Sequence, residues 1–345
     1  ELKQAANIVA KGKKIGIYAG MGSEGAHDLL IELAKKLKAP IAHTSRAKDF
    51  VEYDNPYNVG MTGMLGVPSG FHMMTECDTL LLLGADFAWG QFYPEHANII
   101  QIDRDAARLG RRHPVTLGLE GDVIPSLEAL IPMLSEHSDD AFLNECMSER
   151  KKTEAKLAAE EQAGDGKVIH PQYLAHLIDK HADKDALIAG ETGSQFVWVL
   201  RHIKTNGLRR TMLSLRHGTM ANAMPMALGL KKAFPERQVI SMSGDGGLAM
   251  LLGDLLTINQ ENLPIKIVVL NNASLNFVEL EMNTEGLLNH YTDLKNPSFA
   301  KIADAVGLKS YESSNAATLE ETVQEFLAYP GAALLEVHSN RFELV

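Results

Sequence analysis

Short apolar runs alternate with amphipathic helical patterns along most of the chain. In the first half, apolar runs of four or five residues lie at 15–19, 40–43, 79–83 and 99–102. The alternation restarts after residue 168, with apolar runs at 186–189, 238–242, 265–270 and 333–337. Strands that alternate with helices build parallel sheets that are covered on both faces. We therefore predict an α/β fold of two tandem, doubly wound parallel-sheet domains.

The stretch between these halves has a different character. It is polar and rich in helix-favouring residues, and it then breaks at Gly164 and Gly166. We predict a first domain over 1–145, a linker over 146–167 and a second domain over 168–345. A solvated surface helix is a compatible interpretation of the same polar stretch.

Composition narrows the class of protein. The chain has 345 residues, enough for about two domains, and a formal net charge of −11, which argues against non-specific nucleic-acid binding. Two cysteines cannot form a disulfide framework or a four-thiolate zinc site, so a reducing cytoplasm is the simplest expectation. No apolar run reaches the roughly 18 residues of a membrane-spanning helix.

A glycine-rich turn, Gly20-x-Gly22-x-x-Gly25, follows the first apolar run. Such a turn lets backbone N–H groups and a helix N-terminus meet a phosphate. A nicotinamide site also needs an acid at the end of the next strand, but that strand ends in His43-Thr44-Ser45-Arg46. The motif therefore favours another dinucleotide, with flavin as the best candidate. A glycine turn that only closes the strand–helix unit is the alternative.

A single acid, Asp103, directly follows the apolar run at 99–102. Ligands bind at the carboxyl ends of parallel strands, where this carboxylate could accept hydrogen bonds from ribose hydroxyls. It could equally be a surface aspartate ahead of a helix that begins near Asp105. The sequence does not separate these two interpretations.

The strongest chemical signal joins two strand ends. Gly244-Asp245-Gly246-Gly247 follows one predicted strand, and Asn272 follows the next. Adjacent strands would bring a carboxylate and an amide together, and their hard oxygens suit Mg²⁺. The glycines would open a helix N-terminus that suits a diphosphate. Ordinary turn residues are the alternative, but glycines, spacing and strand ends would then agree by chance.

This pair is the thiamin diphosphate signature, and the chain resembles the family of flavin- and thiamin-diphosphate-dependent pyruvate oxidases and quinone-dependent pyruvate dehydrogenases. The resemblance covers the central and C-terminal domains of that family. It is carried by five segments along nearly the whole chain, at 51–57, 60–63, 169–174, 217–225 and 244–278.

The resemblance implies a thiamin diphosphate site in the second domain. Mg²⁺ would be held by Asp245, Asn272 and the carbonyl of Ser274, and the Gly218 carbonyl and Met220 would hold the cofactor in its bent shape. Phe277 would lie between the thiamin and flavin sites. Met220, Phe277 and Glu281 are the predicted catalytic residues; Glu279 and Glu285 compete with Glu281, and Met220 and Phe277 could instead be core residues. The cofactor-binding residues implied in this domain are Thr192, Gly193, Ser194, Gly218, Thr219, Met220, Asp245, Gly246, Gly247, Asn272, Ala273, Ser274, Leu275, Asn276, Phe277 and Val278. Asn276 stands where the relatives have glycine.

The resemblance also implies an FAD site in the first domain. One flavin-contacting loop would follow the segment at 60–63 and a second would follow the strand at 79–83, while Asp103 would bind the adenosine ribose and Asp122 would lie near the adenine. Trp89 also has a plain interpretation as a packing residue. The implied FAD-binding residues are Gly20, Gly22, Thr62, Gly63, Met64, Leu65, Ala85, Asp86, Phe87, Ala88, Trp89, Asp103 and Asp122.

The implied reaction is the oxidative decarboxylation of pyruvate to acetate and CO₂, with electrons passing from the thiamin-bound enamine to FAD and then to a quinone. The family's N-terminal pyrimidine-binding domain has no match here, so this chain alone is expected to be inactive. A homotetramer in the full-length form is expected, in the cytoplasm, with peripheral contact at the inner face of the membrane through a tail outside this chain. The alternatives are an oxygen-dependent pyruvate oxidase, a non-redox thiamin enzyme such as acetolactate synthase or a 2-oxo-acid decarboxylase, and a non-catalytic cofactor-binding module.

Overall fold

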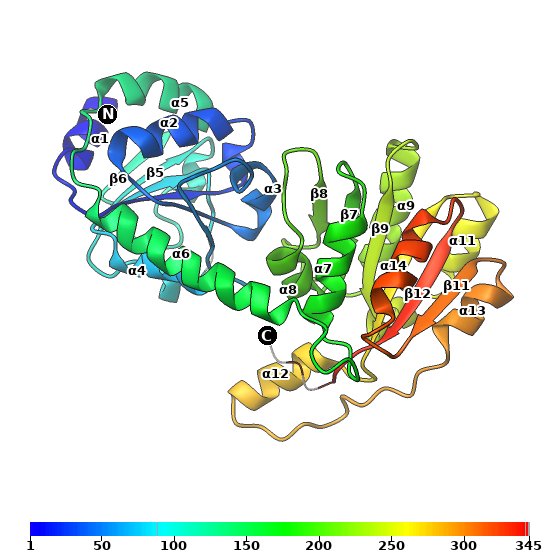
Figure 1. The fold of residues 1–345 in the computed structure, drawn as a ribbon. Helices are drawn as coiled ribbons and strands as arrows, with labels where there is room; N and C mark the ends of the chain where they lie inside the picture. Colours follow the sequence, from blue (N-terminus) through cyan, green and yellow to red (C-terminus); the bar gives the residue numbers. More distant parts are fainter. Residues whose placement is uncertain (88, 342, 344–345) are drawn as a thin grey trace. The chain divides into compact units, whose positions relative to one another are not determined.

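The computed structural model describes residues 1–87, 89–341 and 343. Contacts between residues divide the chain into two compact units, one formed by Glu1–Lys156 with Thr205–Gly207 and the other by the remainder. Each unit contains one six-stranded parallel sheet with helices packed on it (Figure 1). The predicted α/β class with two parallel-sheet domains is therefore confirmed.

The first sheet has the strand order β3-β2-β1-β4-β5-β6. Its strands are β1 (Ile15–Ala19), β2 (Ile41–His43), β3 (Asn58–Met61), β4 (Thr79–Leu83), β5 (Asn98–Asp103) and β6 (Leu117–Glu120). The order reverses between β1 and β4, and a crevice at such a switch point is where ligands bind in open α/β sheets. The four predicted strands are present. The apolar pattern missed β3 and β6, which are short and contain glycine.

Helices cover both faces of the first sheet. They are α1 (Leu2–Val9), α2 (His27–Leu37), α3 (Lys48–Val51), α4 (Pro68–Glu76), α5 (Val123–Leu130) and α6 (Ala141–Glu160), with short 3₁₀ turns at Met21–Ser23, Ser45–Ala47, Gly90–Phe92, Ala106–Arg108 and Ile131–Met133. Alternate side chains of β1 enter different cores, since Ile17 packs in one buried cluster and Tyr18 in another. This alternation is the strand periodicity of two.

The predicted linker is mostly helical. Helix α6 runs unbroken for 20 residues from Ala141 to Glu160, and its buried positions are Phe142, Cys146 and Thr153. The division between the two units falls inside it, after Lys156. The alternative of a largely solvated helix therefore describes the first part of this stretch, and only the part after Glu160 is a loop.

The second sheet has the order β11-β12-β10-β9-β7-β8. Its strands are β7 (Leu187–Gly190), β8 (Arg210–Leu213), β9 (Val239–Gly244), β10 (Ile265–Asn271), β11 (Lys309–Ser313) and β12 (Ala333–His338). The central strands β9 and β10 are buried along their whole length, as expected for strands covered on both faces. In their register Gly244 pairs with Leu270, so the residues that follow the two strands emerge at one edge of the sheet.

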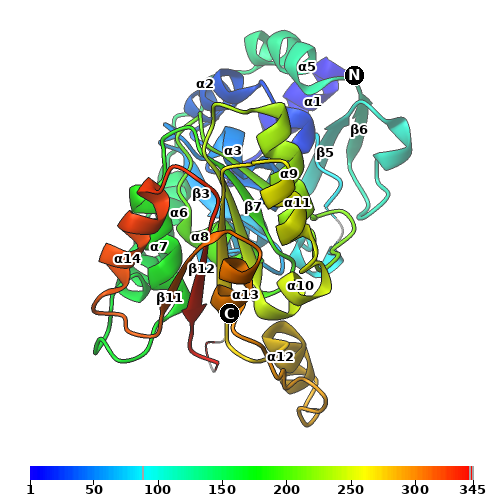
Figure 2. The same cartoon turned by 90° about the vertical axis from the view of Figure 1, so that its right-hand side faces the viewer.

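The helices of the second unit are α7 (Pro171–His181), α8 (Ser194–His202), α9 (Ala223–Ala233), α10 (Asp245–Met250), α11 (Asp254–Gln260), α12 (Asn276–Thr284), α13 (Phe299–Ala305) and α14 (Leu319–Ala328). Helix α12 lies beyond the end of the sheet where β12 terminates (Figure 2). No helix within the described ranges is both long and apolar enough to cross a lipid bilayer.

Candidate active site

A pocket of about 270 Å³ lies where β7, β9 and β10 end. Four chain segments converge on it: the turn after β7, the loop before α9, the turn after β9, and the β10–α12 connection. The lining residues are Glu191, Thr192, Gly193, Ser194, Gln195, Met220, Gly244, Asp245, Gly246, Gly247, Asn272, Ser274, Leu275, Asn276, Phe277, Val278 and Glu281. The structure thus brings together most of the thiamin-site residues that the family resemblance implied, including the three predicted magnesium ligands.

Asp245 begins α10 and is nearly fully buried. Its Oδ1 accepts the Gly246 N–H at 2.8 Å, and its Oδ2 accepts the Ala273 N–H at 2.8 Å and Nδ2 of Asn296 at 2.7 Å. Burial raises the pKa of Asp245, and these hydrogen bonds oppose the rise. A bound divalent cation would stabilise the ionised carboxylate further, so this residue fits the predicted role of metal ligand.

The turn after β10 places the other two predicted ligands. Asn272 Oδ1 accepts the Ser274 N–H at 3.1 Å, which closes a turn around Ala273. Ala273 has a left-handed φ of 56°, and Ser274 forms an antiparallel bridge with Asp293. The sharp turn directs Asn272 and Ser274 into the pocket while Ala273 itself stays outside its lining. Oxygens from these residues and Asp245 are the ligand type that Mg²⁺ prefers.

Two glycines let the backbone form the floor of the pocket. A Cβ at Gly247 would lie 2.5 Å from Cδ of Glu191, a separation that real structures do not show. A Cβ at Gly246 would lie 3.0 Å from Leu275 and 3.4 Å from Cε of Met220. Only glycine leaves room here for both the buried acid and a ligand, which supports close backbone approach to a diphosphate.

Hydrogen bonds attach the segment that carries Met220 to the end of β7. Asn222 donates its backbone N–H to Oε1 of Glu191 at 3.0 Å and its Nδ2 to the Gly190 carbonyl at 2.8 Å, and its Oδ1 accepts the Thr192 N–H at 3.0 Å. Ala221 takes a left-handed φ of 60° between them. Met220 therefore reaches the pocket, whereas the predicted residues Gly218 and Thr219 are exposed and do not line it.

Helix α12 supplies the remaining predicted residues. Phe277 and Glu281 line the pocket, but Glu279 is buried and bound by Thr292 and by Arg341, each at 2.7 Å. Of the competing acids, the geometry therefore favours Glu281 over Glu279. Asn276 lies in the first turn of α12 with a right-handed helical backbone, so the glycine of the relatives is not required here.

The sequence analysis missed Glu191 and Gln195, which also line the pocket. Burial raises the pKa of Glu191 to about 7, and backbone N–H groups, Asn222 first, oppose the rise. Its Oε2 is buried and lacks a hydrogen-bond partner among the described residues. An acid two residues after the predicted strand at 186–189 was the available signal for Glu191. No sequence feature singled out Gln195.

In the first unit, the glycine turn packs against the end of the neighbouring strand. The N–H groups of Gly20 and Gly22 donate to the carbonyls of Leu83 and Gly84, at 2.8 and 2.9 Å. A Cβ at Gly20 would lie 2.4 Å from Cα of Ala85. Close backbone packing thus explains both glycines without a ligand, as the alternative interpretation held, and their approach to a flavin diphosphate stays a prediction.

The other predicted flavin residues gather at the same edge, after β3, β4 and β5. Phe87 is buried and packs edge-on against Trp89, which is 41% exposed. Asp86 pairs with Arg111 and Arg112, which lower its pKa although burial alone would raise it. Ala88 lies outside the described residues.

Two predicted acids serve local structure. Oδ1 of the buried Asp103 accepts the Asp105 N–H at 3.0 Å, and Asp122 caps α5 by accepting the Ile124 N–H at 3.2 Å. Their contacts with a flavin stay predictions. Two buried hydroxyls nearby, at Thr44 and Thr62, have no hydrogen-bond partner in the described parts of the chain. Such orphaned groups fit a ligand with polar atoms at this edge.

The pocket at the carboxyl edge of the second sheet thus has glycines that fit a diphosphate and oxygen atoms that fit a divalent cation. Two family models agree with this class: the thiamine pyrophosphate enzyme central domain matches residues 2–130, and the thiamine pyrophosphate enzyme C-terminal TPP binding domain matches residues 191–337. The chain belongs to the thiamine pyrophosphate enzyme family.

Three curated relatives resemble the chain over most of its length. The thiamine pyrophosphate-containing protein YdaP of Bacillus subtilis is 33% identical over 95% of this chain and 57% of its own length. Acetolactate synthase isozyme 1 large subunit of Escherichia coli is 30% identical over 100% of this chain and 62% of its own length. Pyruvate oxidase of Lactiplantibacillus plantarum is 28% identical over 90% of this chain and 52% of its own length. The chain therefore spans little more than half the length of these relatives.

Proposed function

We propose that the protein to which this chain belongs oxidises pyruvate with thiamin diphosphate, Mg²⁺ and FAD, and delivers the electrons to a quinone. In balance, pyruvate and water give acetate, CO₂, two protons and two electrons, and the quinone becomes a quinol. The observation that carries the proposal is the convergence of Asp245, Asn272 and Phe277 on one pocket.

The residues of the pocket fit the thiamin cofactor in distinct ways. Asp245, Asn272 and the Ser274 carbonyl would hold Mg²⁺, while Thr192, Gly193 and Ser194 would face the diphosphate from the turn after β7. When bound, thiamin diphosphate supplies a carbanion that attacks a 2-oxo acid and an electron sink for the loss of CO₂.

Side chains from α12 and from the loop before α9 would surround the bound substrate. Met220 and Phe277 present apolar surface to the pocket, which excludes water from the reacting carbonyl. Glu281 is exposed and lines the pocket, so its carboxylate is placed to hold or release a proton. Exclusion of water strengthens these electrostatic interactions.

FAD would be held by the first unit. The unpartnered hydroxyls of Thr44 and Thr62 lie at the strand ends of β2 and β3, and Asp103 ends β5. A tetramer and peripheral membrane contact are part of the same proposal and follow from the family resemblance alone.

A second candidate function is the non-redox condensation of an acetolactate synthase. The specific support is the similarity to acetolactate synthase isozyme 1, which extends over 100% of this chain. Such an enzyme would use the same metal ligands but would not reduce its flavin with pyruvate.

The two candidates separate in one experiment. The full-length protein to which this chain belongs is purified and supplied with thiamin diphosphate and Mg²⁺. Its visible spectrum is recorded without oxygen, before and after pyruvate is added. A flavin spectrum that bleaches supports the proposal, and added quinone or oxygen then identifies the acceptor. A flavin that stays oxidised while pyruvate disappears supports the synthase. Absence of bound flavin contradicts the FAD assignment.

A further inference from the structure

A series of hydrogen-bonded polar side chains connects Asp245 to Glu336. Asn296, in the loop between α12 and α13, places its Nδ2 2.7 Å from Oδ2 of Asp245 and 2.9 Å from Oδ1 of Asn271. Nδ2 of Asn271 in turn lies 2.7 Å from Oε1 of Glu336. We call Asn296, Asn271 and Glu336 the relay. Asn271 and Glu336 are buried, on the neighbouring strands β10 and β12.

The contacts of Asn271 and Glu336 fix which atoms of the relay donate hydrogen bonds and which accept them. Oε2 of Glu336 accepts the Ala300 N–H at 2.9 Å, so both oxygens of this carboxylate act as acceptors. Asn271 must therefore present its NH₂ group to Glu336 and its carbonyl to Asn296. The Ala273 N–H, 3.3 Å from Oδ1 of Asn271, requires the same orientation because a backbone donor cannot be exchanged for an acceptor.

This direction makes Asn296 a donor toward the metal site. Because Oδ1 of Asn271 accepts from Asn296, the Asn296 amide presents its NH₂ group to Asp245 as well. We propose that Asn296 and Asn271 are positioning residues that orient the Asp245 carboxylate toward its divalent cation, and that Glu336 sets their direction. The inference rests on the metal site of the proposed function. Partners behind a metal ligand commonly set its orientation and affinity.

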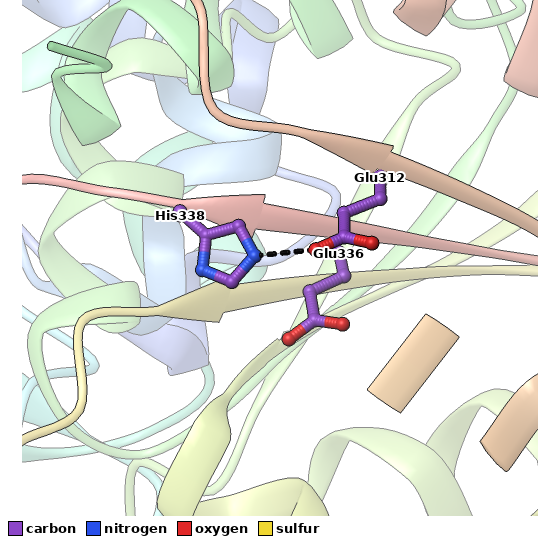
Figure 3. Close-up of side chains that lie close together, drawn as sticks. All are labelled: Glu312, Glu336 and His338. Atoms are coloured by element: carbon purple, nitrogen blue, oxygen red, sulfur yellow. Dashed lines mark hydrogen bonds and ion pairs between the residues drawn. The ribbon is translucent and has the colours of Figure 1, made fainter. Parts of the chain in front are cut away.

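A neighbouring acid provides a matched control. Glu312 pairs with Glu336 in the register of β11 and β12, and its Oε1 lies 2.8 Å from Nε2 of His338. Ligand atoms of Glu312, Glu336 and His338 lie within 4.8 Å of one another, and Figure 3 shows the His338–Glu312 contact beside the separate carboxylate of Glu336. Glu312 is exposed and its carboxylate bonds to His338, so neutralising it alters the charge beside Glu336 and leaves the hydrogen bonds of the relay in place.

The test compares Mn²⁺ binding by the intact purified protein and its variants, with thiamin diphosphate present, by electron paramagnetic resonance. Asn296→Leu removes the donor from a half-buried loop position. Glu336→Gln replaces one of the two acceptor oxygens with an NH₂ group. In one orientation of the new amide this group faces the NH₂ group of Asn271, and in the other it faces the Ala300 N–H, so two donors oppose each other in both cases. We expect both variants to weaken Mn²⁺ binding by about 10-fold to 100-fold and to broaden the spectrum of the bound ion. Glu312→Gln should stay within about twofold of wild type.

The outcomes separate the two proposals. If Asp245→Ala loses Mn²⁺ binding while Asn296→Leu, shown folded by circular dichroism, keeps the wild-type affinity and spectrum, the relay has no positioning role. If wild type and Asp245→Ala bind Mn²⁺ equally, the metal site itself is wrong. Asn296→Leu decides the question if the buried Glu336→Gln change prevents folding.

Discussion

Glu191 accepts a hydrogen bond from the backbone N–H of Asn222 at 3.0 Å, and through it the segment carrying Met220 is tied to the end of β7. The cost of this tie is a nearly buried carboxyl whose pKa burial raises to about 7. The acid thus organises the pocket while retaining its proton to a much higher pH than an exposed glutamate does.

The stability of the wild-type protein should fall between about pH 4.5 and pH 7 because of Glu191. The unfolded chain ionises near 4.5, whereas the folded chain retains the proton to about 7, so rising pH favours unfolding over this window. Glu191→Gln removes this dependence. Relative to wild type, its free energy of unfolding should rise on the order of 3 kcal/mol from pH 4.5 to pH 8. Urea titrations at both pH values measure it; a difference independent of pH would show that Glu191 titrates normally.

Gly247→Ala should weaken cofactor binding. The new methyl group would lie 2.5 Å from the Glu191 carboxyl carbon, and relieving such overlap costs about 1–3 kcal/mol. Thiamin diphosphate affinity, measured by calorimetry with Mg²⁺, should fall about tenfold or more. Gly229→Ala is the control, because a Cβ there meets nothing within 4 Å on helix α9. It should stabilise the protein by about 0.5–1 kcal/mol and leave binding unchanged.

Glu52→Gln should destabilise the first unit at pH 7. Burial alone would raise the pKa of Glu52, but Lys48 and His43 lower it to about 2. The stability that these two contacts give the folded protein is therefore fully present above about pH 4.5 and is lost as the pH falls toward 2. The variant should lose about 3 kcal/mol at pH 7.

Chemical denaturation at several pH values follows the Glu52 effect. The gap between wild type and Glu52→Gln should close as the solution is acidified. Glu149→Gln, at an exposed pair with Lys152, should change stability little at any pH. A constant gap down to pH 2 would contradict the role assigned to Glu52.

Both cysteines should resist thiol reagents in the folded protein. Cys77 is 5% exposed and Cys146 is fully buried, and burial raises the pKa of each thiol to about 12. The thiolate that reacts is therefore almost absent at pH 8. A chromogenic disulfide reagent should label neither thiol under native conditions and both in denaturant. Rapid native labelling would show that this core opens readily.

The sequence predicted the parts of the site that depend on strand ends. Asp245 and Asn272 follow two strongly apolar runs, and strands of that kind pair centrally in a parallel sheet, so their convergence was foreseeable. The same logic located Gly20 and Asp103. It failed for β8 and β11, whose exposed positions dilute the apolar pattern.

Other site residues lie beyond the reach of a linear pattern. Asn296 lies in a loop that returns to the turn after β10. Two bonds of 2.9 Å hold it there, from the Leu275 N–H to the Thr292 carbonyl and from the Leu294 N–H to the Ala273 carbonyl. Nothing in its neighbours along the chain predicts that return. Gln195 fills the space over Gly244, a contact that only the packed structure defines.

The register of β9 and β10 has a consequence for how the protein acquires activity. Asp245 and Asn272 approach each other only because Gly244 pairs with Leu270, and a shift of one residue would turn every side chain of a strand to the opposite face. Metal affinity should therefore be absent from folding intermediates in which β10 is unpaired or misaligned. A cation bound by these residues would report that the sheet has assembled correctly, and would stabilise that assembly against its alternatives.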